Sequence, residues 1–280
     1  MTWLTYASLS IFFSIATNLL TRVLAVKSDN TRAFAFVYGV FTTTIAAFLF
    51  IPHVDFGNIS ASTKIVLLII LASALYGIFD RTQFSARKHI DASTLSILFR
   101  GSALITFFAS ILILGESITL NKMLGATLIV LANIILSYKD RTLKIKKEWL
   151  YAIPPVVTLG LVYVIDKVVV QSFPSELYNV IVWITPLLFV YFPYIPKKQL
   201  KREFKVGPLW IALAATANVL TYYFILKAFE LYEASRIVMV TSTSTIFVVL
   251  AGVLLLKERD HIPQKLMASI VAVGGILLII

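Results

Sequence analysis

The chain alternates between long uncharged stretches and short polar ones along its whole length. The uncharged stretches lie at 2–21, 32–51, 65–86, 92–114, 121–138, 149–168, 176–195, 207–229, 235–256 and 264–280. A helix needs about 20 residues to cross the apolar layer of a membrane, and each stretch is close to that length. The pattern therefore predicts an all-α polytopic membrane protein with ten transmembrane helices.

The composition supports this prediction and leaves no room for a soluble domain. The 280 residues have a mean hydropathy of +0.90, and 14% of them are charged, against about 25% in soluble proteins. The first stretch has no basic segment before it and reaches a full spanning length, which argues against a cleaved signal peptide. We therefore expect it to be retained as a helix.

The distribution of basic residues predicts the orientation of the chain. Its net charge is +11, and 19 of the 25 Lys and Arg follow odd-numbered spans, 5 follow even-numbered ones, and Arg100 lies inside the fourth. The positive-inside rule then places the loops at 139–148 and 197–206 in the cytoplasm and both termini outside a cell (inner) membrane. The basic charge is therefore explained by membrane topology, with some contact between the loops and membrane lipid, and we expect no nucleic acid as a partner.

An internal repeat divides the chain into two halves. A shift of 142 residues aligns 92–126 with 234–268 without a gap, pairing two Ala-Ser dipeptides and matching Glu116 with Glu258. Nearer the start of each half the shift is 145, which pairs Arg22 with Lys167 and Tyr38 with Trp183.

Five helices in each half make the second copy enter the membrane inverted, because five is an odd number. We expect a first repeat at 1–138, a basic linker at 139–148 and a second repeat at 149–280. Inverted repeats are typical of secondary transporters, whose substrate site lies near mid-membrane between the two copies.

Two copies of one motif carry a resemblance to a known family. An Ala-containing helix end, "SARKHIDAS" or "LKAFELYEAS", precedes an apolar helix that finishes in Leu114-Gly115-Glu116 or Leu256-Lys257-Glu258. Over nearly its whole length the chain resembles the EamA-like ten-helix members of the drug/metabolite transporter superfamily. Asn18 keeps part of the family's first-helix pattern, whereas the frequent prolines of helices four and nine are replaced around Arg100 and Thr241. The resemblance implies a transporter and favours export.

Arg100 is the residue that most needs an explanation, because a guanidinium in mid-membrane costs at least a few kcal/mol. Helices three and four should form an antiparallel hairpin, and Asp80 lies about as far before its turn as Arg100 lies after it. An Asp80–Arg100 ion pair is therefore predicted, with Arg81 as a competitor for the carboxylate. Arg100 could serve only in that pair, could also attract a carboxylate or phosphate into a polar cavity, or could reach toward the interface.

Other polar residues near mid-span are candidates for the same cavity. Thr241, Ser242 and Thr245 fall at the level of Arg100 in the second repeat; alternatively, their hydroxyls bond carbonyls one turn back. The remaining candidate substrate-binding residues share a mid-span position, with interhelical hydrogen bonding as the alternative role: Asn18, Tyr38, Trp183, Asn218 and Tyr222.

Charged residues near the outer ends of helices six and eight are candidates for gating or proton coupling. They include Asp166, Lys227 and Glu230, which could also be ordinary charges at the membrane rim. Glu116 and Glu258 are interpreted as structural caps. Small residues at Ala268 and Ala272 are typical either of close helix packing or of a homodimer interface.

Other chemistry has no motif in the sequence. The chain has no cysteine, no nucleotide-binding P-loop and no HExxH, and its three histidines are scattered, so we expect no enzyme, metal site or cofactor. The leading hypothesis is a secondary transporter that alternates access to a midplane cavity and is coupled to protons or sodium. Its substrate would be an amino-acid-like or other zwitterionic or anionic metabolite. The alternatives are a flippase for lipid-linked envelope precursors, an accessory membrane subunit, or a sensor or scaffold that does not transport.

Overall fold

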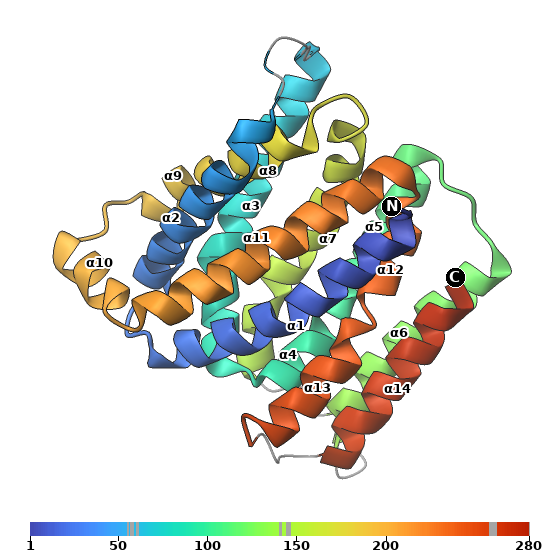
Figure 1. The fold of residues 1–280 in the computed structure, drawn as a ribbon. Helices are drawn as coiled ribbons and strands as arrows, with labels where there is room; N and C mark the ends of the chain where they lie inside the picture. The colour runs from blue at the N-terminus through green and yellow to red at the C-terminus, as the bar shows by residue number, and fades with distance from the viewer. Residues whose placement is uncertain are drawn as a thin grey trace.

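In the computed structural model of the chain, the described residues are 1–54, 56, 59, 62–139, 142–143, 147–257 and 262–279. Nearly all of them are helical, and Figure 1 shows the helices assembled side by side. Seven helical segments within these residues are long and apolar enough to cross a membrane, and the shorter Ser175–Tyr191 is also apolar. The predicted all-α membrane fold is confirmed.

The first half has a described helix, or two consecutive ones, at each of its five predicted spans. In chain order these are α1 (Trp3–Lys27), α2 (Thr31–Phe50) with the short 3-10 helix η1 (Ile51–His53), α3 (Thr63–His89), α4 (Ala92–Leu98) with α5 (Arg100–Leu114), and α6 (Leu120–Ser137). The fourth span is thus two helices that meet at Phe99.

The second half repeats this order after a linker that lies partly outside the described residues. In the linker, β1 (Tyr138–Lys139) pairs antiparallel with β2 (Thr142–Leu143). The helices that follow are η3 (Lys147–Ala152) with α7 (Ile153–Val169), α8 (Ser175–Ile184) with α9 (Pro186–Tyr191), α10 (Lys197–Phe204), α11 (Pro208–Leu231), α12 (Ala234–Thr241) with α13 (Ser244–Leu254), and α14 (Ile262–Ile279).

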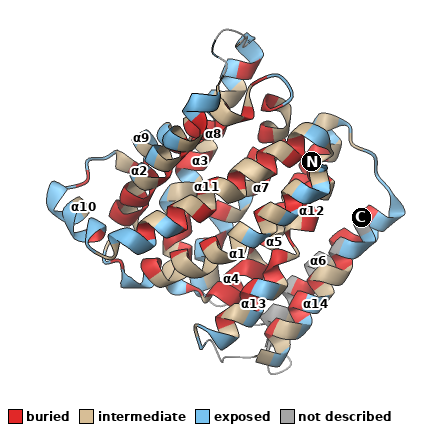
Figure 2. Cartoon of the chain, in the orientation of Figure 1, coloured by how far each residue is buried: buried red, intermediate tan, exposed pale blue. Residues whose placement is uncertain are grey.

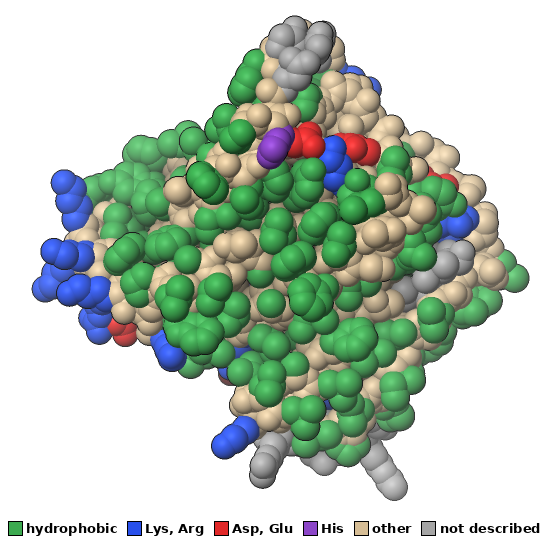
Figure 3. All heavy atoms as spheres, in the orientation of Figure 1, with side chains coloured by type: hydrophobic (Ala, Val, Ile, Leu, Met, Phe, Trp, Pro, Cys, Tyr) green, Lys and Arg blue, Asp and Glu red, His purple; other side chains and the backbone are tan. Residues whose placement is uncertain are grey.

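One predicted loop is a helix instead. The basic segment at 197–206 contains α10, whose Glu203 is 1% exposed and accepts hydrogen bonds from the backbone nitrogens of Asp29 (3.1 Å) and Asn30 (2.8 Å). Those nitrogens precede the first turn of α2, which the Asn30 side chain also caps. The lysines and arginine of α10 gather at one end of the molecule in Figure 3.

The outer surface of the bundle is apolar. Large side chains such as Phe12, Phe48 and Leu112 are 68%, 80% and 83% exposed, respectively. Figure 3 shows hydrophobic side chains covering most of the visible face, and Figure 2 shows buried positions on the inward sides of the helices. Lipid is the medium that such a continuous apolar surface fits.

The packing of the helices follows the inverted repeat. The first helix of each half packs against the third span of the other, α1 against α11 and α7 against α3, while α6 packs against α14. We call the end of the bundle where α1 begins and α14 ends the terminal face, and the opposite end, which carries α10, the basic face.

Equivalent basic residues make equivalent contacts at these two faces. Arg22 donates to the carbonyl oxygens of Arg87 and Lys88 (2.7 Å for Lys88), where α3 ends at the basic face. Lys167 donates to the carbonyl oxygen of Phe229 (2.5 Å), where α11 ends at the terminal face. Each cation thus neutralises the carbonyl end of a helix in its own repeat, and the inversion predicted from the Arg22–Lys167 match is visible in the contacts.

The small residues of α14 serve packing inside the chain. Ala268 and Ala272 are 0% exposed and belong to the same buried cluster as Ala132 of α6. They are therefore covered by α6 and do not form a dimer face. A homodimer through another surface stays a prediction.

Candidate functional site

Two helices break near the middle of the bundle. Phe99 separates α4 from α5, and Ser242 and Thr243 separate α12 from α13. The hydroxyl of Ser242 donates to the Val238 carbonyl oxygen (2.6 Å), and the hydroxyl of Thr241 bonds Ile237 in the same way (3.0 Å). Hydroxyls that bond a carbonyl one turn back often bend a helix. The interpretation that these hydroxyls bond carbonyls one turn back is confirmed for Thr241 and Ser242 and is wrong for Thr245, which bonds the Ser96 carbonyl.

One carbonyl at the first break joins the two repeats. The Ser96 oxygen accepts a hydrogen bond from Arg100 Nε (3.0 Å) and a longer one from the Thr245 hydroxyl (3.5 Å). Arg100 is therefore held at the break by the helix turn that precedes it. Thr245 is 0% exposed and reaches the same oxygen from α13.

A cavity of about 140 Å³ lies beside these breaks. Helices of both repeats contribute to its wall, and seven of the predicted site residues line it: Asn18, Arg100, Trp183, Asn218, Tyr222, Thr241 and Ser242. Serine and threonine hydroxyls, among them those of Ser10, Ser14 and Thr221, add to its polar lining. The sequence prediction of a mixed polar and aromatic cavity between the repeats is in accord with this lining.

A second arginine also lines the cavity. Arg87 is 6% exposed, and its Nη1 donates to Asn18 Oδ1 (3.1 Å) while its Nε donates to Gln83 Oε1 (3.4 Å). Its guanidinium carbon lies 5.7 Å from the centre of the Phe99 ring, at the break. Neither Arg87 nor Arg100 forms an ion pair with any carboxylate of the described residues. The described residues that line the cavity thus include two arginines and no carboxylate.

The predicted pair between Asp80 and Arg100 is wrong. The Asp80 carboxylate accepts a hydrogen bond from Gln83 Nε2 (2.7 Å), and Arg100 bonds the Ser96 carbonyl. The prediction assumed that consecutive helices are neighbours along their full length, as they usually are. Here α7 packs closely against both α3 and α5 and takes the place between them. Asp80 lies outside the cavity lining and is connected, through Gln83, to Arg87.

Tyr38 and Thr245 also lie outside the cavity lining. The Tyr38 hydroxyl donates to the Ala214 carbonyl oxygen (3.1 Å), and its ring packs edge to face against Phe84, with 5.2 Å between ring centres. Tyr38 therefore fastens α2 to α11. Trp183, which matches Tyr38 in the repeat, lines the cavity, whereas Tyr38 does not.

Sequence reasoning missed Arg87 because it placed the residue in the loop after the third span. The helix α3 continues to His89 and so carries Arg87 along the helix face of Asp80 and Gln83. The spacing of three and four residues between these side chains is the signal that could have found it.

The three gating candidates fall into two separate groups. Lys227 forms ion pairs with Glu176 (2.8 Å) and Glu230 (3.0 Å) near the terminal face. Asp166 is 0% exposed and instead accepts hydrogen bonds from the hydroxyls of Tyr178 (2.6 Å) and Tyr76 (2.7 Å). The expectation that Asp166 could be a rim charge is therefore wrong.

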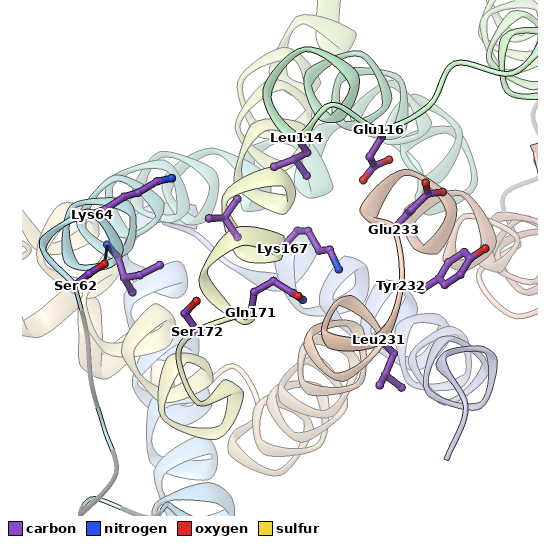
Figure 4. Close-up of a pocket in the computed structure, with 12 residues that line it drawn as sticks. Ser62, Lys64, Leu114, Glu116, Lys167, Gln171, Ser172, Leu231, Tyr232 and Glu233 are labelled. Carbon is purple, nitrogen blue, oxygen red and sulfur yellow. Dashed lines mark hydrogen bonds between the residues drawn. The ribbon is translucent and has the colours of Figure 1, made fainter.

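A larger pocket of about 650 Å³ opens at the terminal face. Figure 4 shows Lys167 and Gln171 at its centre and Glu116 and Glu233 together on one side. Glu116 accepts hydrogen bonds from the backbone nitrogen of Ala234 (3.1 Å) and from the Ser235 hydroxyl. It is thus a cap, as predicted, but for α12 in the other repeat. Glu258 lies outside the described residues.

No group of three or more His, Asp or Glu that could hold a metal ion occurs in the described part of the chain. The chemistry of the central cavity is therefore that of two guanidinium groups, amides, hydroxyls and aromatic rings. Such a set can bind carboxylate or phosphate by charge-assisted hydrogen bonds and can pack an apolar portion against Trp183 and Tyr222.

Comparisons with known proteins give a family and a shared fold. The model of the EamA-like transporter family matches residues 1–138 and 146–280. A solved structure titled "Crystal structure of protein" superposes with a TM-score of 0.69 at 14% identity, covering 98% of this chain and 95% of that chain. A comparison with curated proteins finds no match.

Proposed function

Because the chain belongs to the EamA-like transporter family of the drug/metabolite transporter superfamily, we propose that it is a secondary transporter of a small anionic or zwitterionic metabolite. The observation that carries the proposal is that Arg87 and Arg100 both line the central cavity without a carboxylate partner among the described residues. Arg87 is buried and Arg100 is half-buried, and guanidinium groups in such positions are unfavourable without a counter-charge. A bound anion supplies what they lack.

The lining also indicates the size and shape of the substrate. A cavity of about 140 Å³ is small, since pockets for drug-sized ligands have roughly 300–1,000 Å³. A compound with one carboxylate or phosphate and a short side chain fits this space. Trp183 and Tyr222 offer an apolar wall, whose edge-to-face contact (5.7 Å between ring centres) keeps both rings in place.

The inverted repeat supports alternating access as the mechanism. The cavity lies where the broken helices of the two repeats meet, so that rocking one repeat against the other would open it to either face. Its polar lining on several sides favours a water-soluble metabolite over the lipid-linked precursor of a flippase, and nothing in this mechanism requires a catalytic step.

The orientation in the cell membrane is part of the proposal. The charge bias supports a cytoplasmic basic face and an external terminal face, with both termini outside. We propose export rather than uptake, on the family resemblance alone.

A thermal-shift screen of the purified protein against metabolites tests the proposal, followed by transport of the compounds found in proteoliposomes. Charge-assisted hydrogen bonds contribute about 1.5–3 kcal/mol, so Arg100→Leu or Arg87→Leu should weaken binding about 10- to 150-fold. Arg81→Gln is the matched control, because Arg81 is exposed and bonds the carbonyls of Phe189 and Phe192. Equal binding and transport by all three variants would exclude the two-arginine site.

A further inference from the structure

The Asp166 carboxylate lies inside the bundle with hydroxyl groups as its hydrogen-bond partners. Its side chain is on α7, and the donors come from α3 (Tyr76 to Oδ2, 2.7 Å) and α8 (Tyr178 to Oδ1, 2.6 Å). The hydroxyl of Tyr222, on α11, faces the same carboxylate but lies outside hydrogen-bond geometry. Tyrosine side chains from three helices therefore surround the Asp166 carboxylate.

The charged side chains around this cluster are engaged elsewhere. Lys167, the next residue, donates to the carbonyl of Phe229 (2.5 Å). Lys227 of α11 and Glu176 of α8 pair with each other, and Glu233, which precedes α12, pairs with Lys122. Tyr163, on α7 itself, is close enough to interact electrostatically with both Asp166 and Arg100. Within the described residues, no ion pair reaches the Asp166 carboxylate.

A carboxyl group with phenol partners can exist in either protonation state. When ionised, it accepts from the two hydroxyls. When neutral, it donates its own proton to a tyrosine oxygen, because a hydroxyl can rotate between donor and acceptor roles. A lysine or arginine partner would instead hold the carboxylate in its ionised form. Burial disfavours the ionised form, so a change in hydration changes the state.

The position of Asp166 connects it to the central cavity. Tyr76 and Tyr222 line the central cavity, while the following residues Lys167 and Val168 line the pocket at the terminal face. The Tyr76 hydroxyl, 2.7 Å from Asp166 Oδ2, is the link between the carboxylate and the central cavity. A proton can therefore reach the carboxylate from the central cavity past a single side chain, and the rocking that exposes this cavity to either face would expose the proton site with it.

We propose that Asp166 is the proton-binding site of the transporter, with Tyr76 and Tyr178 as its hydrogen-bonding cage. This inference rests on the proposed function for its coupling to transport, and on the geometry alone for proton binding. The two phenol hydrogens point at the carboxylate oxygens that a sodium ion would have to approach, so the site favours a proton.

An infrared titration of the purified full chain tests proton binding without any substrate. A carboxylic C=O stretching band should appear as the pH is lowered and should be missing in Asp166→Asn. It should remain, with a changed midpoint, in Tyr178→Phe. Glu176→Gln is the control, because Glu176 is paired with Lys227 (2.8 Å), and its band pattern should match the parent protein. An unchanged titrating band in Asp166→Asn would overturn the proposal.

Coupling to conformation is tested with one cysteine introduced at Ser244, which lines the cavity in a chain that has no cysteine of its own. Labelling from each side of proteoliposomes should depend on pH in Ser244→Cys and lose that dependence when Asp166→Asn is added. Dependence on sodium at constant pH, in place of dependence on pH, would assign the site to sodium and overturn the proposal. The two proposals can also fail separately. If Asp166 titrates while the Arg87 and Arg100 variants transport normally, the anion site is rejected and the proton site is retained.

Discussion

The Lys122 ammonium lies 3.3 Å from the Glu233 carboxylate and joins α6 of the first repeat to the start of α12 in the second. A similar pair is formed by Lys265 of α14, one residue beyond the position that matches Lys122 in the repeat, and its ammonium lies 3.4 Å from Asp91 at the start of α4. Both lysines are nearly buried, at 1% and 3% side-chain exposure. The inverted repeat thus places one cross-repeat ion pair at each face, and each pair holds the short half of a broken helix.

Lys122→Met should lower the stability of the protein. Removing one partner of a fully buried pair costs about 3–5 kcal/mol, and because Glu233 is 32% exposed we expect about 1–3 kcal/mol. Thermal unfolding in detergent measures the effect, and the exchanged pair Lys122→Glu with Glu233→Lys should recover part of it. Asp29→Asn is the control, since the Asp29–Arg202 pair is exposed on both sides (55% and 71%) and such pairs contribute little. Equal melting temperatures of Lys122→Met and the parent protein would show that the Lys122–Glu233 pair does not stabilise the contact between the repeats.

Arg87 and Arg100 should act on the same bound anion. If both guanidinium groups contact one substrate, the two substitutions to Leu should together weaken binding by less than the product of their separate effects. A double-mutant cycle on the dissociation constant of a screened compound measures this coupling. Fully independent losses would mean that the two arginines serve different ligands or different parts of the transport cycle.

Much of the fold was predictable because its signals are local. Apolar stretches mark the spans, and the paired Ala-Ser motifs reveal the repeat without knowledge of any contact. Arg100 was also visible, since a charge within an apolar stretch requires compensation.

The partners of the site residues were harder to predict, because they depend on which helices are neighbours. Asp80 misses Arg100 since α7 packs between their helices. The tyrosines that bond Asp166 lie 90 and 12 residues away in sequence, on two other helices. Arg87 was overlooked because α3 continues to His89, three residues beyond the predicted end of its span. A residue that was predicted to lie in a loop therefore lies on the helix and lines the cavity.

Glu116→Ala should loosen the first turn of α12. The carboxylate bonds the Ala234 nitrogen and the Ser235 hydroxyl, and loss of a helix N-cap costs about 0.5–2 kcal/mol. Hydrogen exchange of the amides at the start of α12 should become faster while that of α11 stays the same. Glu148→Ala, at an exposed position, should leave both rates unchanged. Unaltered exchange in Glu116→Ala would show that α12 does not depend on this cap.

Gly160→Ala should destabilise the contact between α5 and α7. An added Cβ would lie 2.6 Å from Ile105 Cβ and 2.8 Å from the Ser102 carbonyl oxygen, and neither atom can move without shifting the backbone of α5. The Thr106 hydroxyl also bonds the Gly160 carbonyl (2.9 Å), so this close approach includes a hydrogen bond. Overpacking of this kind costs about 1–3 kcal/mol.

Gly274→Ala provides the matched comparison for that variant. An added Cβ at Gly274, in α14, meets nothing within 4 Å, and alanine is favoured over glycine inside a helix by roughly 0.5–1 kcal/mol. The melting temperature in detergent should therefore fall for Gly160→Ala and stay level or rise for Gly274→Ala. Because α5 begins at Arg100, Gly160→Ala should also weaken anion binding at the cavity. A decrease in melting temperature of the same size in both variants would show that glycine flexibility, rather than the close approach of α5 and α7, accounts for the effect.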